Sequence, residues 1–549
     1  MEKFNDLTEK DFKEFFSWLL EKDIELKKEL DYTLCASAEE PYVYYPEQMA
    51  EFIQTRPMQR LKRIEQLGTS VLNNVDACHT RYSHCLGTYN NAVIFYLYQY
   101  RNPEWKTRIE AEDRKIEVLA DIMEALRHDD GHNILSHGLE RLIGQAKGTH
   151  EVVGGRFKDE LPETIAALDK IHPKLRETMK RVSRDDYDLI TLREGNLDFD
   201  RLDFVSRDSL YLGLPEKRSL SHELLKRSNV VHFPTTSTPR EMVIYDYEAL
   251  PFIEAFIETR ADLYKRFVSS NERKSLDILE EEFCRIFLDS NISGGKRLRK
   301  YLEHCQGSSA TTIDLEEFLS WNDLKYYNEL IDIALTSEDD NIQRIASACL
   351  PSKEGLCSLA IEILNPKNTD PATYTDEDRL FLQNIRDILK KDHPLHDRLE
   401  EQNVRACLRI LNATQQSEVE SVLQSLRRQG LTSQDLAGIT TWDETVKKYN
   451  FNETIFVRDK NGNVFPLQHH PELSIDLSPI HISGALFIPS KLRRLGVPEE
   501  KIDLIQREFE TFGVEHPIGN QEYKRTMRKF KQGEEIKVPE YRGEKGRND

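Results

Sequence analysis

Side chains that could bind a metal ion are concentrated in one stretch of the chain. Six of the sixteen histidines lie between residues 79 and 150: His79, His84, His128, His132, His137 and His150. Within ALRHDDGHNILSH, residues 125–137, His128 and Asp129 are adjacent and Gly131 follows. A neutral imidazole and a carboxylate are ordinary ligands for transition metals and for magnesium-like ions. The pattern predicts a metal site around His128 and Asp129.

Two ligands do not complete a metal site, so others must come from elsewhere in the chain. His84 is an upstream candidate, and the segment LDFDRLDFVSRD at 197–208 supplies Asp198, Asp200, Asp203 and Asp208. At helical spacing Asp200, Asp203 and Arg207 share one face. The alternative interpretation is a solvated charged helix, but the interleaved leucines, phenylalanines and valine indicate that the segment packs.

Five motifs occur in a characteristic order: QRLKRIEQLG (59–68), HTRYSHCLG (79–87), HDDGHNILSH (128–137), HE (150–151) and DFDRLDFVSRD (198–208). In this the chain resembles the HD-domain dNTP triphosphohydrolases, the dGTPase-like family, over about residues 46–290. The resemblance implies a mainly α fold with a helical HD-domain core. It also implies metal-dependent hydrolysis of deoxynucleoside triphosphates to deoxynucleoside and triphosphate.

The resemblance assigns roles by position. It implies the metal ligands His84, His128, Asp129 and Asp200 and the catalytic residues His132, His150 and Glu140. For substrate binding it implies Arg81 and Arg207 at the phosphates, Gln66 and Asp208 at the sugar 3′-hydroxyl, Leu67 under the sugar, and Phe204 where a tyrosine is common. The resemblance also implies a divalent metal as cofactor, which could be manganese, magnesium, iron or zinc.

Each role has an alternative in the residues themselves. The four ligands could form a buried polar network without metal, and His132 and His150 could be structural histidines near the site. Glu140 could form a simple helix ion pair. For the whole protein, the alternatives are an HD-type nuclease on single-stranded nucleic acid and a non-catalytic nucleotide sensor. A nuclease would need a basic groove with stacking aromatics.

Some positions depart from the family pattern. Arg127 and Asp130 flank the His-Asp pair where apolar residues are usual, and they could pair with each other. Asn133 alters the following turn. Gln54 and Lys62 stand where vertebrate members use an aspartate and an arginine to bind an activating guanine nucleotide. Lysine lacks the planar fork of arginine, so we predict that GTP is not an obligatory activator, although another nucleotide effector is possible.

These side chains must be positioned by helices. Ile116, Leu119, Ile122, Met123 and Leu126 repeat at helical spacing and predict an amphipathic helix. Residues 92–98 predict a buried helix. We divide the chain into an N-terminal helical segment (1–45), the HD-domain core (46–330), a helical extension (331–440) and a C-terminal α+β lobe with a polar tail (441–549). Asn461-Gly462 between two short apolar runs predicts a hairpin over 455–467.

Composition limits the partners. Acidic residues outnumber Lys plus Arg by 96 to 76, which gives a formal net charge of −20. Such a chain repels nucleic acid on average, so a nucleic-acid partner is not expected. The eight cysteines form no CxxC motif and are expected to be reduced, as in the cytoplasm. No apolar run is long enough to span a membrane. Homo-oligomers are expected, with contacts from the C-terminal region.

Overall fold

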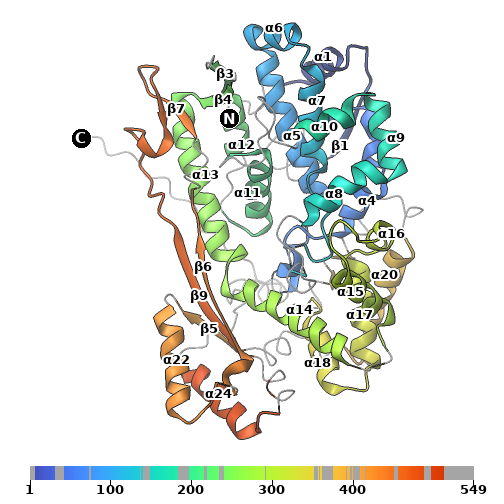
Figure 1. Ribbon diagram of the computed structural model, residues 1–549, viewed down its shortest axis with the longest axis vertical. Coiled ribbons are helices and arrows are strands. Elements are labelled where there is room, and N and C mark those ends of the chain that lie inside the picture. Colours follow the sequence, from blue (N-terminus) through green and yellow to red (C-terminus); the bar gives the residue numbers. More distant parts are fainter. Residues whose placement is uncertain are drawn as a thin grey trace, which may run out of the picture.

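The computed structural model describes residues 7–30, 42–72, 74, 76–136, 138–139, 149–182, 197–214, 219–233, 240–290, 292, 294–351, 356–357, 359–360, 375–390, 392–395, 399, 409–413, 416–433, 435–449, 455–487, 492 and 496–511. The fold is mainly α, as predicted (Figure 1). The helices in the N-terminal half are α1 (Glu9–Leu20), α3 (Glu47–Ile53), α4 (Arg56–Arg60), α5 (Arg81–Tyr100), α6 (Pro103–Ala111), α7 (Lys115–Arg127), α8 (Thr149–Glu160), α9 (Pro162–Ile171), α10 (Leu175–Val182), α11 (Phe199–Tyr211), α12 (Ser219–Lys226) and α13 (Leu250–Leu263).

The second half continues with helices and a few strands. Its helices are α14 (Asn271–Asp289), α15 (Lys296–Gly307), α16 (Leu315–Leu319), α17 (Asp323–Thr336), α18 (Asp340–Ala348), α20 (Asp376–Ile388), α22 (Gln416–Arg428) and α24 (Glu499–Thr511). The strands of the whole chain are β1 (Leu26–Leu30), β2 (Tyr42–Pro46), β3 (Ser228–Phe233), β4 (Arg240–Tyr245), β5 (Arg409–Ala413), β6 (Ile439–Val446), β7 (Phe456–Arg458), β8 (Val464–Pro466) and β9 (Ile480–Phe487).

Helix α5 lies at the centre of the core. It packs against α7, α11 and α12, and residues 92–97 are buried as predicted for this segment. Helix α7 confirms the periodicity seen at 116–126, but its polar side is buried as well. There, the Tyr96 hydroxyl donates to Asp121 at 2.6 Å and Lys158 donates to Glu124 at 2.9 Å. Buried polar groups are stable only when paired. These hydrogen bonds therefore stabilise the polar side of α7, in addition to the apolar packing on its other side.

Two hairpins were not predicted from the sequence. The N-terminal segment contains α1, but β1 follows and pairs antiparallel with β2, where only helices and a linker were expected. Within the core, β3 and β4 pair over six residues. In β1, LKKEL alternates between apolar and charged residues only weakly. It becomes a strand because the tyrosine-rich β2 provides a partner.

The predicted hairpin at 455–467 is present as β7 and β8. Gly462 adopts a left-handed φ of 83°, and Asp459 accepts hydrogen bonds at 2.8 Å from the backbone N–H groups of Asn461 and Asn463. Strand β7 of this hairpin pairs in parallel with β4, so the sheet order is β3-β4-β7-β8. A segment far along the chain therefore completes a sheet of the core.

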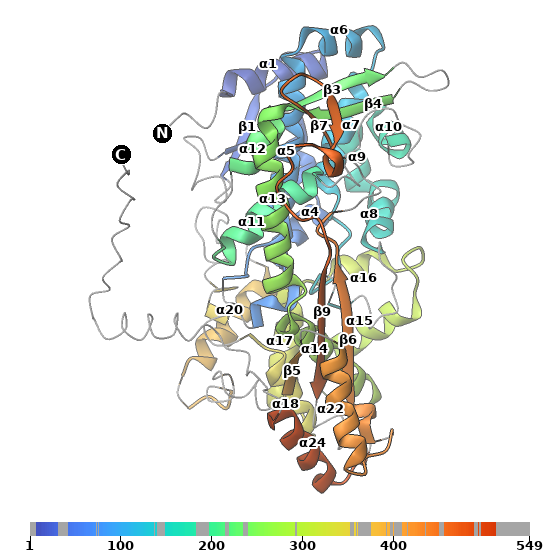
Figure 2. The ribbon, with the colours of Figure 1, turned by 90° about the vertical axis from the view of Figure 1, so that its left-hand side faces the viewer.

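Strands β6 and β9 form a long antiparallel pair that leads from the upper body to a second group of elements (Figures 1 and 2). There, β5 joins β9, and α22 and α24 pack against the strands around a separate hydrophobic cluster that includes Val422, Leu426 and Ile505. The main cluster extends from the N-terminal helix through the helical extension. The proposed domain limits stay a prediction; α17 runs across residue 330. Residues 512–549, with the predicted polar tail, lie outside the described residues.

Among the described residues no helix has both the length and the apolarity that crossing a membrane requires. The cysteines in this part of the chain are free thiols, and Cys85, Cys284, Cys305 and Cys349 are buried.

A buried carboxyl group in helix α14 should make the stability of the protein depend on pH. The side chain of Glu280 in α14 is buried and accepts a hydrogen bond from the Tyr326 hydroxyl. Burial raises its pKa to about 8, and Asp277 and Asp323 add to the effect. Between the ordinary glutamate pKa and pH 8 the folded protein holds a proton that the unfolded chain releases, so stability falls as pH rises.

We therefore expect Glu280→Gln to unfold at the same temperature as the wild type near pH 5 and at a higher one at pH 8–9. The difference should be on the order of a few kcal/mol in the free energy of unfolding. Thermal unfolding across this pH range is the measurement. Glu281→Gln on the same helix, which loses an ion pair with Arg285, is the control. An equal rise of the unfolding temperature above that of the wild type at pH 8–9 in both variants would contradict the assignment.

Candidate metal centre

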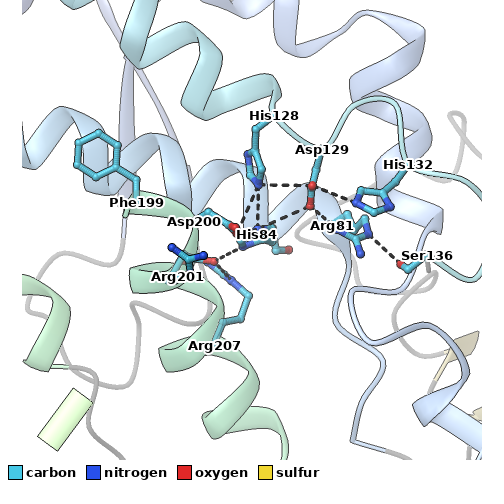
Figure 3. Close-up of polar contacts among 12 residues, drawn as sticks. Arg81, His84, His128, Asp129, His132, Ser136, Phe199, Asp200, Arg201 and Arg207 are labelled. Atoms are coloured by element: carbon cyan, nitrogen blue, oxygen red, sulfur yellow. Dashed lines mark hydrogen bonds and ion pairs between the residues drawn. The ribbon is translucent and has the colours of Figure 1, made fainter. Parts of the chain in front are cut away.

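Three helices meet at the candidate site (Figure 3). Arg81 and His84 lie in the first turn of α5. Helix α7 ends at Arg127, which places His128 at its C-cap and Asp129 just beyond. Asp200 lies in the first turn of α11, after the N-cap Asp198, whose carboxylate accepts from the Arg201 backbone N–H at 2.6 Å. Helix ends bring side chains of distant segments to a common point.

The structure brings the four predicted ligands together. The Nε2 atoms of His84 and His128 lie 3.1 Å apart, and Asp200 Oδ1 lies 2.9 Å from the first and 3.6 Å from the second. Asp129 oxygens lie 3.7 Å from His84 Nε2 and 3.5 Å from His128 Nε2. Metal–ligand bonds of about 2.0–2.2 Å separate neighbouring ligand atoms by similar distances.

The tautomers of both histidines fit a cation. The backbone carbonyl of Ala125 can only accept, so His128 Nδ1 donates to it at 3.0 Å. His84 Nδ1 lies 2.8 Å from Asp203 Oδ2 and donates to that carboxylate. In the neutral imidazole, both Nε2 lone pairs then face the same point. Such outer hydrogen bonds are typical of metal-bound histidines, and two facing lone pairs need a proton or a metal ion between them.

Electrostatics agree with this interpretation. Burial opposes a charged His84, but Asp200 and Asp203 overcome it and raise its pKa to about 10. Burial likewise opposes ionised Asp129, but Arg81, His128 and His132 hold its pKa well below the usual value. The cluster thus concentrates negative charge on groups that attract either protons or a metal. Metal binding to such groups displaces protons.

A second group of side chains shares Asp129. His132 Nε2 lies 3.2 Å from Asp129 Oδ1, and the His132 ring stacks on His150 with centroids 4.0 Å apart. Burial and the nearby Arg81 hold the pKa of His132 well below its usual value. Asp129, His132 and His150 also form a possible metal-binding group. Glu140 and His137, the other predicted residues of this region, lie outside the described residues.

The two predicted phosphate-binding arginines differ in their partners. Arg81 donates from Nε to Ser136 Oγ at 2.8 Å and from Nη1 to the Asp129 carboxylate. Arg207 instead forms two hydrogen bonds with Asp203, at 2.8 and 2.9 Å. Arg207 thereby holds the carboxylate that orients His84. Its phosphate-binding role stays a prediction. The orienting role of Asp203 was missed, although its spacing from Arg207 contained the signal.

The predicted sugar-binding residues lie near one another. Asp208 Oδ1 lies 2.7 Å from His79 Nε2, and the Gln66 backbone N–H donates to the His79 carbonyl at 2.9 Å. The ring of His79 stacks on Tyr211. Gln66 Oε1 is buried and has no hydrogen-bond partner within the described part of the chain. Leu67 is buried, and Phe204 packs partly buried against the main core.

The residues that depart from the family pattern pair as expected. Arg127 Nη2 lies 3.0 Å from Asp130 Oδ2, and Arg127 also bonds Glu124 at 2.8 Å and the Gly154 carbonyl. Burial raises the pKa of Asp130 to about 6 although Arg127 opposes it. This network joins the end of α7 to α8, the helix that carries His150. At the other departures, the Lys62 ammonium lies 4.5 Å from the Tyr82 ring centroid and Gln54 is exposed.

A close approach of α5 and α11 also supports the centre. A Cβ at Gly87 would overlap the Asp203 carboxylate and the Arg207 guanidinium. We expect Gly87→Ala to push Asp203 away from His84 and to lower metal affinity about tenfold, in the range of other outer-partner changes. Metal titration and thermal unfolding are the measurements. Gly155→Ala, with open space at its Cβ, is the control; unchanged metal affinity in Gly87→Ala would contradict this role.

Comparison with known proteins relates the sequence to HD-domain proteins. No family model matches the chain. An uncharacterised Mycoplasma pneumoniae protein, the MG461 homolog, is 26% identical over 55% of this chain and 73% of its own. The deoxynucleoside triphosphate triphosphohydrolase SAMHD1 homolog of Dictyostelium discoideum is 28% identical over 31% of this chain and 34% of its own length. A putative HD domain-containing protein of Acanthamoeba polyphaga mimivirus is 26% identical over 34% of this chain and 45% of its own.

Solved structures share the fold. A phosphohydrolase from Bacteroides thetaiotaomicron superposes with a TM-score of 0.55 at 18% identity, over 84% of this chain and 99% of its own. A hypothetical protein from Aquifex aeolicus gives 0.54 at 18% identity, over 86% of this chain and 99% of its own. The sequence relatives and the shared fold together support a relationship of this chain to the HD-domain phosphohydrolase superfamily.

Proposed function

We propose that this protein is a metal-dependent phosphohydrolase that converts deoxynucleoside triphosphates to deoxynucleoside and triphosphate. The observation that supports this most is the convergence of His84 Nε2, His128 Nε2, Asp129 and Asp200 on one point, with Arg81 beside it. The relationship to HD-domain phosphohydrolases supports a metal-dependent hydrolase. The dNTP substrate is proposed from the resemblance of the five motifs.

The two histidines and two aspartates would hold a divalent ion. Such an ion would supply Lewis-acid chemistry and would lower the pKa of a nearby water molecule. Arg81, already beside Asp129, would contact the phosphates and offset the net charge of −20, which repels a triphosphate. His150 would deliver a proton to the leaving 5′ oxygen, and the stacked His132, whose low pKa keeps its ring neutral, would hold the His150 ring in place. Water attacks phosphorus, and the bond to that oxygen breaks.

The test is incubation of the purified protein with single dNTPs, NTPs and single-stranded DNA, each with manganese or magnesium. We expect deoxynucleoside and inorganic triphosphate in equal amounts from the dNTPs. Shortened oligonucleotides would favour the nuclease alternative, and nucleotide binding without turnover would favour a sensor. Adding GTP to each reaction tests whether it is an obligatory activator. The mass in solution, with and without nucleotide, tests the predicted homo-oligomer.

A further inference from the structure

The turn that follows the His-Asp pair has an unusual backbone. Leu135 and Ser136 have φ angles of 52° and 54°. Left-handed conformations are uncommon outside glycine and cost free energy unless the surroundings hold them. Two such residues in succession therefore need support. Ser136 receives the hydrogen bond from Arg81, which in turn bonds Asp129 (Figure 3).

That support comes from segments near residue 300, outside the five motifs. The Tyr301 hydroxyl donates to Asn133 Oδ1, and Tyr301 stacks on Trp321 with centroids 4.6 Å apart. Arg60 bridges the two regions, since it donates to the carbonyls of His132 and Trp321 at 2.6 Å each. These contacts hold the turn at 132–136 against α15 and against the residues just before α17.

One carboxylate makes the most direct connection. Asp323, the first residue of α17, is fully buried; its Oδ1 accepts from the Leu135 N–H at 2.7 Å and its Oδ2 from the Glu65 N–H at 2.9 Å. The Glu65 carbonyl accepts in turn from Ser136 Oγ at 2.7 Å. Asp323 therefore links two segments through hydrogen bonds. One is the turn at 132–136, which follows Asp129, and the other is the loop that contains Gln66 and Leu67.

We propose that Asp323 is a positioning residue of the active centre, which sets the Ser136–Arg81–Asp129 chain and the loop of Gln66 and Leu67 in one geometry. The role of this geometry in turnover rests on the proposed dNTP hydrolysis, whereas its role in metal binding rests only on the metal site that the proposal contains. Only a carboxylate can accept from both N–H groups. An asparagine of the same shape keeps one acceptor and turns an amide N–H toward the second donor, which leaves that buried donor unsatisfied.

The experiment compares Asp323→Asn, Asp323→Ala and the matched control Asp378→Asn. Asp378 is also a buried carboxylate in the first turn of a helix of the extension, where it accepts from the Thr375 N–H at 2.9 Å and from Arg63 Nε at 2.7 Å. Within the described part of the chain, its hydrogen bonds and ion pair do not reach the turn at 132–136. The measurements are manganese affinity by electron paramagnetic resonance, kcat and KM with a dNTP, and thermal unfolding.

We expect Asp323→Asn to weaken manganese binding about tenfold and to lower kcat at least tenfold, with Asp323→Ala more severe. The control should lose similar thermal stability and keep both values. If the folded Asp323 variants bind manganese and turn over as the control does, the proposal is overturned. If the wild type binds manganese but hydrolyses no dNTP, the proposed function fails, while the affinity series still decides the role of Asp323.

Discussion

Replacing His128 by alanine should remove the bound metal and the hydrolase activity together. His128 Nε2 lies at the point where His84, Asp129 and Asp200 converge. If these four side chains hold a divalent ion as proposed, loss of one of them would open the site and misplace the water molecule that the ion would activate. Activity should fall by more than the 10–100-fold that follows loss of an outer partner. Metal content of the purified variant and its rate with a single dNTP are the measurements.

His222→Ala is the matched control for this variant. His222 is half-buried on α12 and lies 3.0 Å from the Tyr98 hydroxyl, away from the metal centre. Removing the His222 side chain should lose a similar number of packing contacts but leave metal content and turnover unchanged. A folded His128→Ala protein with wild-type metal content and rate would show that the four side chains form a polar network without metal.

Discrimination between sugars should be the second large effect. If Gln66 and Asp208 bond the 3′-hydroxyl, substrates that lack it leave buried polar atoms unpaired, and Gln66 Oε1 already has no partner in the described structure. A site that bonds a hydroxyl rejects an analogue without it by up to about 10⁴–10⁵. A steric barrier to the 2′-hydroxyl, the role that the family resemblance implies for Leu67, discriminates less. We expect 2′,3′-dideoxynucleotides to react at least about 10²-fold more slowly than dNTPs, and ribonucleotides to suffer no more than that.

Leu67→Ala should raise the rate with ATP relative to dATP, because the wall against the 2′-hydroxyl is removed. Leu72→Ala is the control, since Leu72 is a buried leucine in the same region and loses the same atoms. Rates with dATP, ATP and the dideoxy analogue are measured for each variant. They separate the contribution of the 3′-hydroxyl contacts from the steric contribution of Leu67. Equal turnover of ATP and dATP by the wild type would contradict this sugar pocket.

Local pattern predicted the elements that depend on local causes. The spacing of apolar residues at 116–126 predicted α7, and Asn461-Gly462 predicted the β7–β8 hairpin, because helix period and turn chemistry are properties of neighbouring residues. The β1–β2 and β3–β4 hairpins escaped prediction. Their strands are short, and each becomes a strand through the partner that covers it. The parallel pairing of β4 with β7 joins residues more than two hundred positions apart.

The candidate site also shows which features depend on local sequence and which depend on tertiary structure. Residue types indicated which side chains could bind a metal, the family resemblance of the motifs selected four of them, and Asp203 was predicted to share a face with Arg207. Only the tertiary structure placed Asp203 behind His84, turned Arg207 toward Asp203, and set the Asp323 carboxylate against the turn at 135–136. Donor chemistry is a property of a residue, so sequence determines it. The direction in which a buried donor points depends on helix ends and backbone N–H groups from segments that meet only when the chain folds.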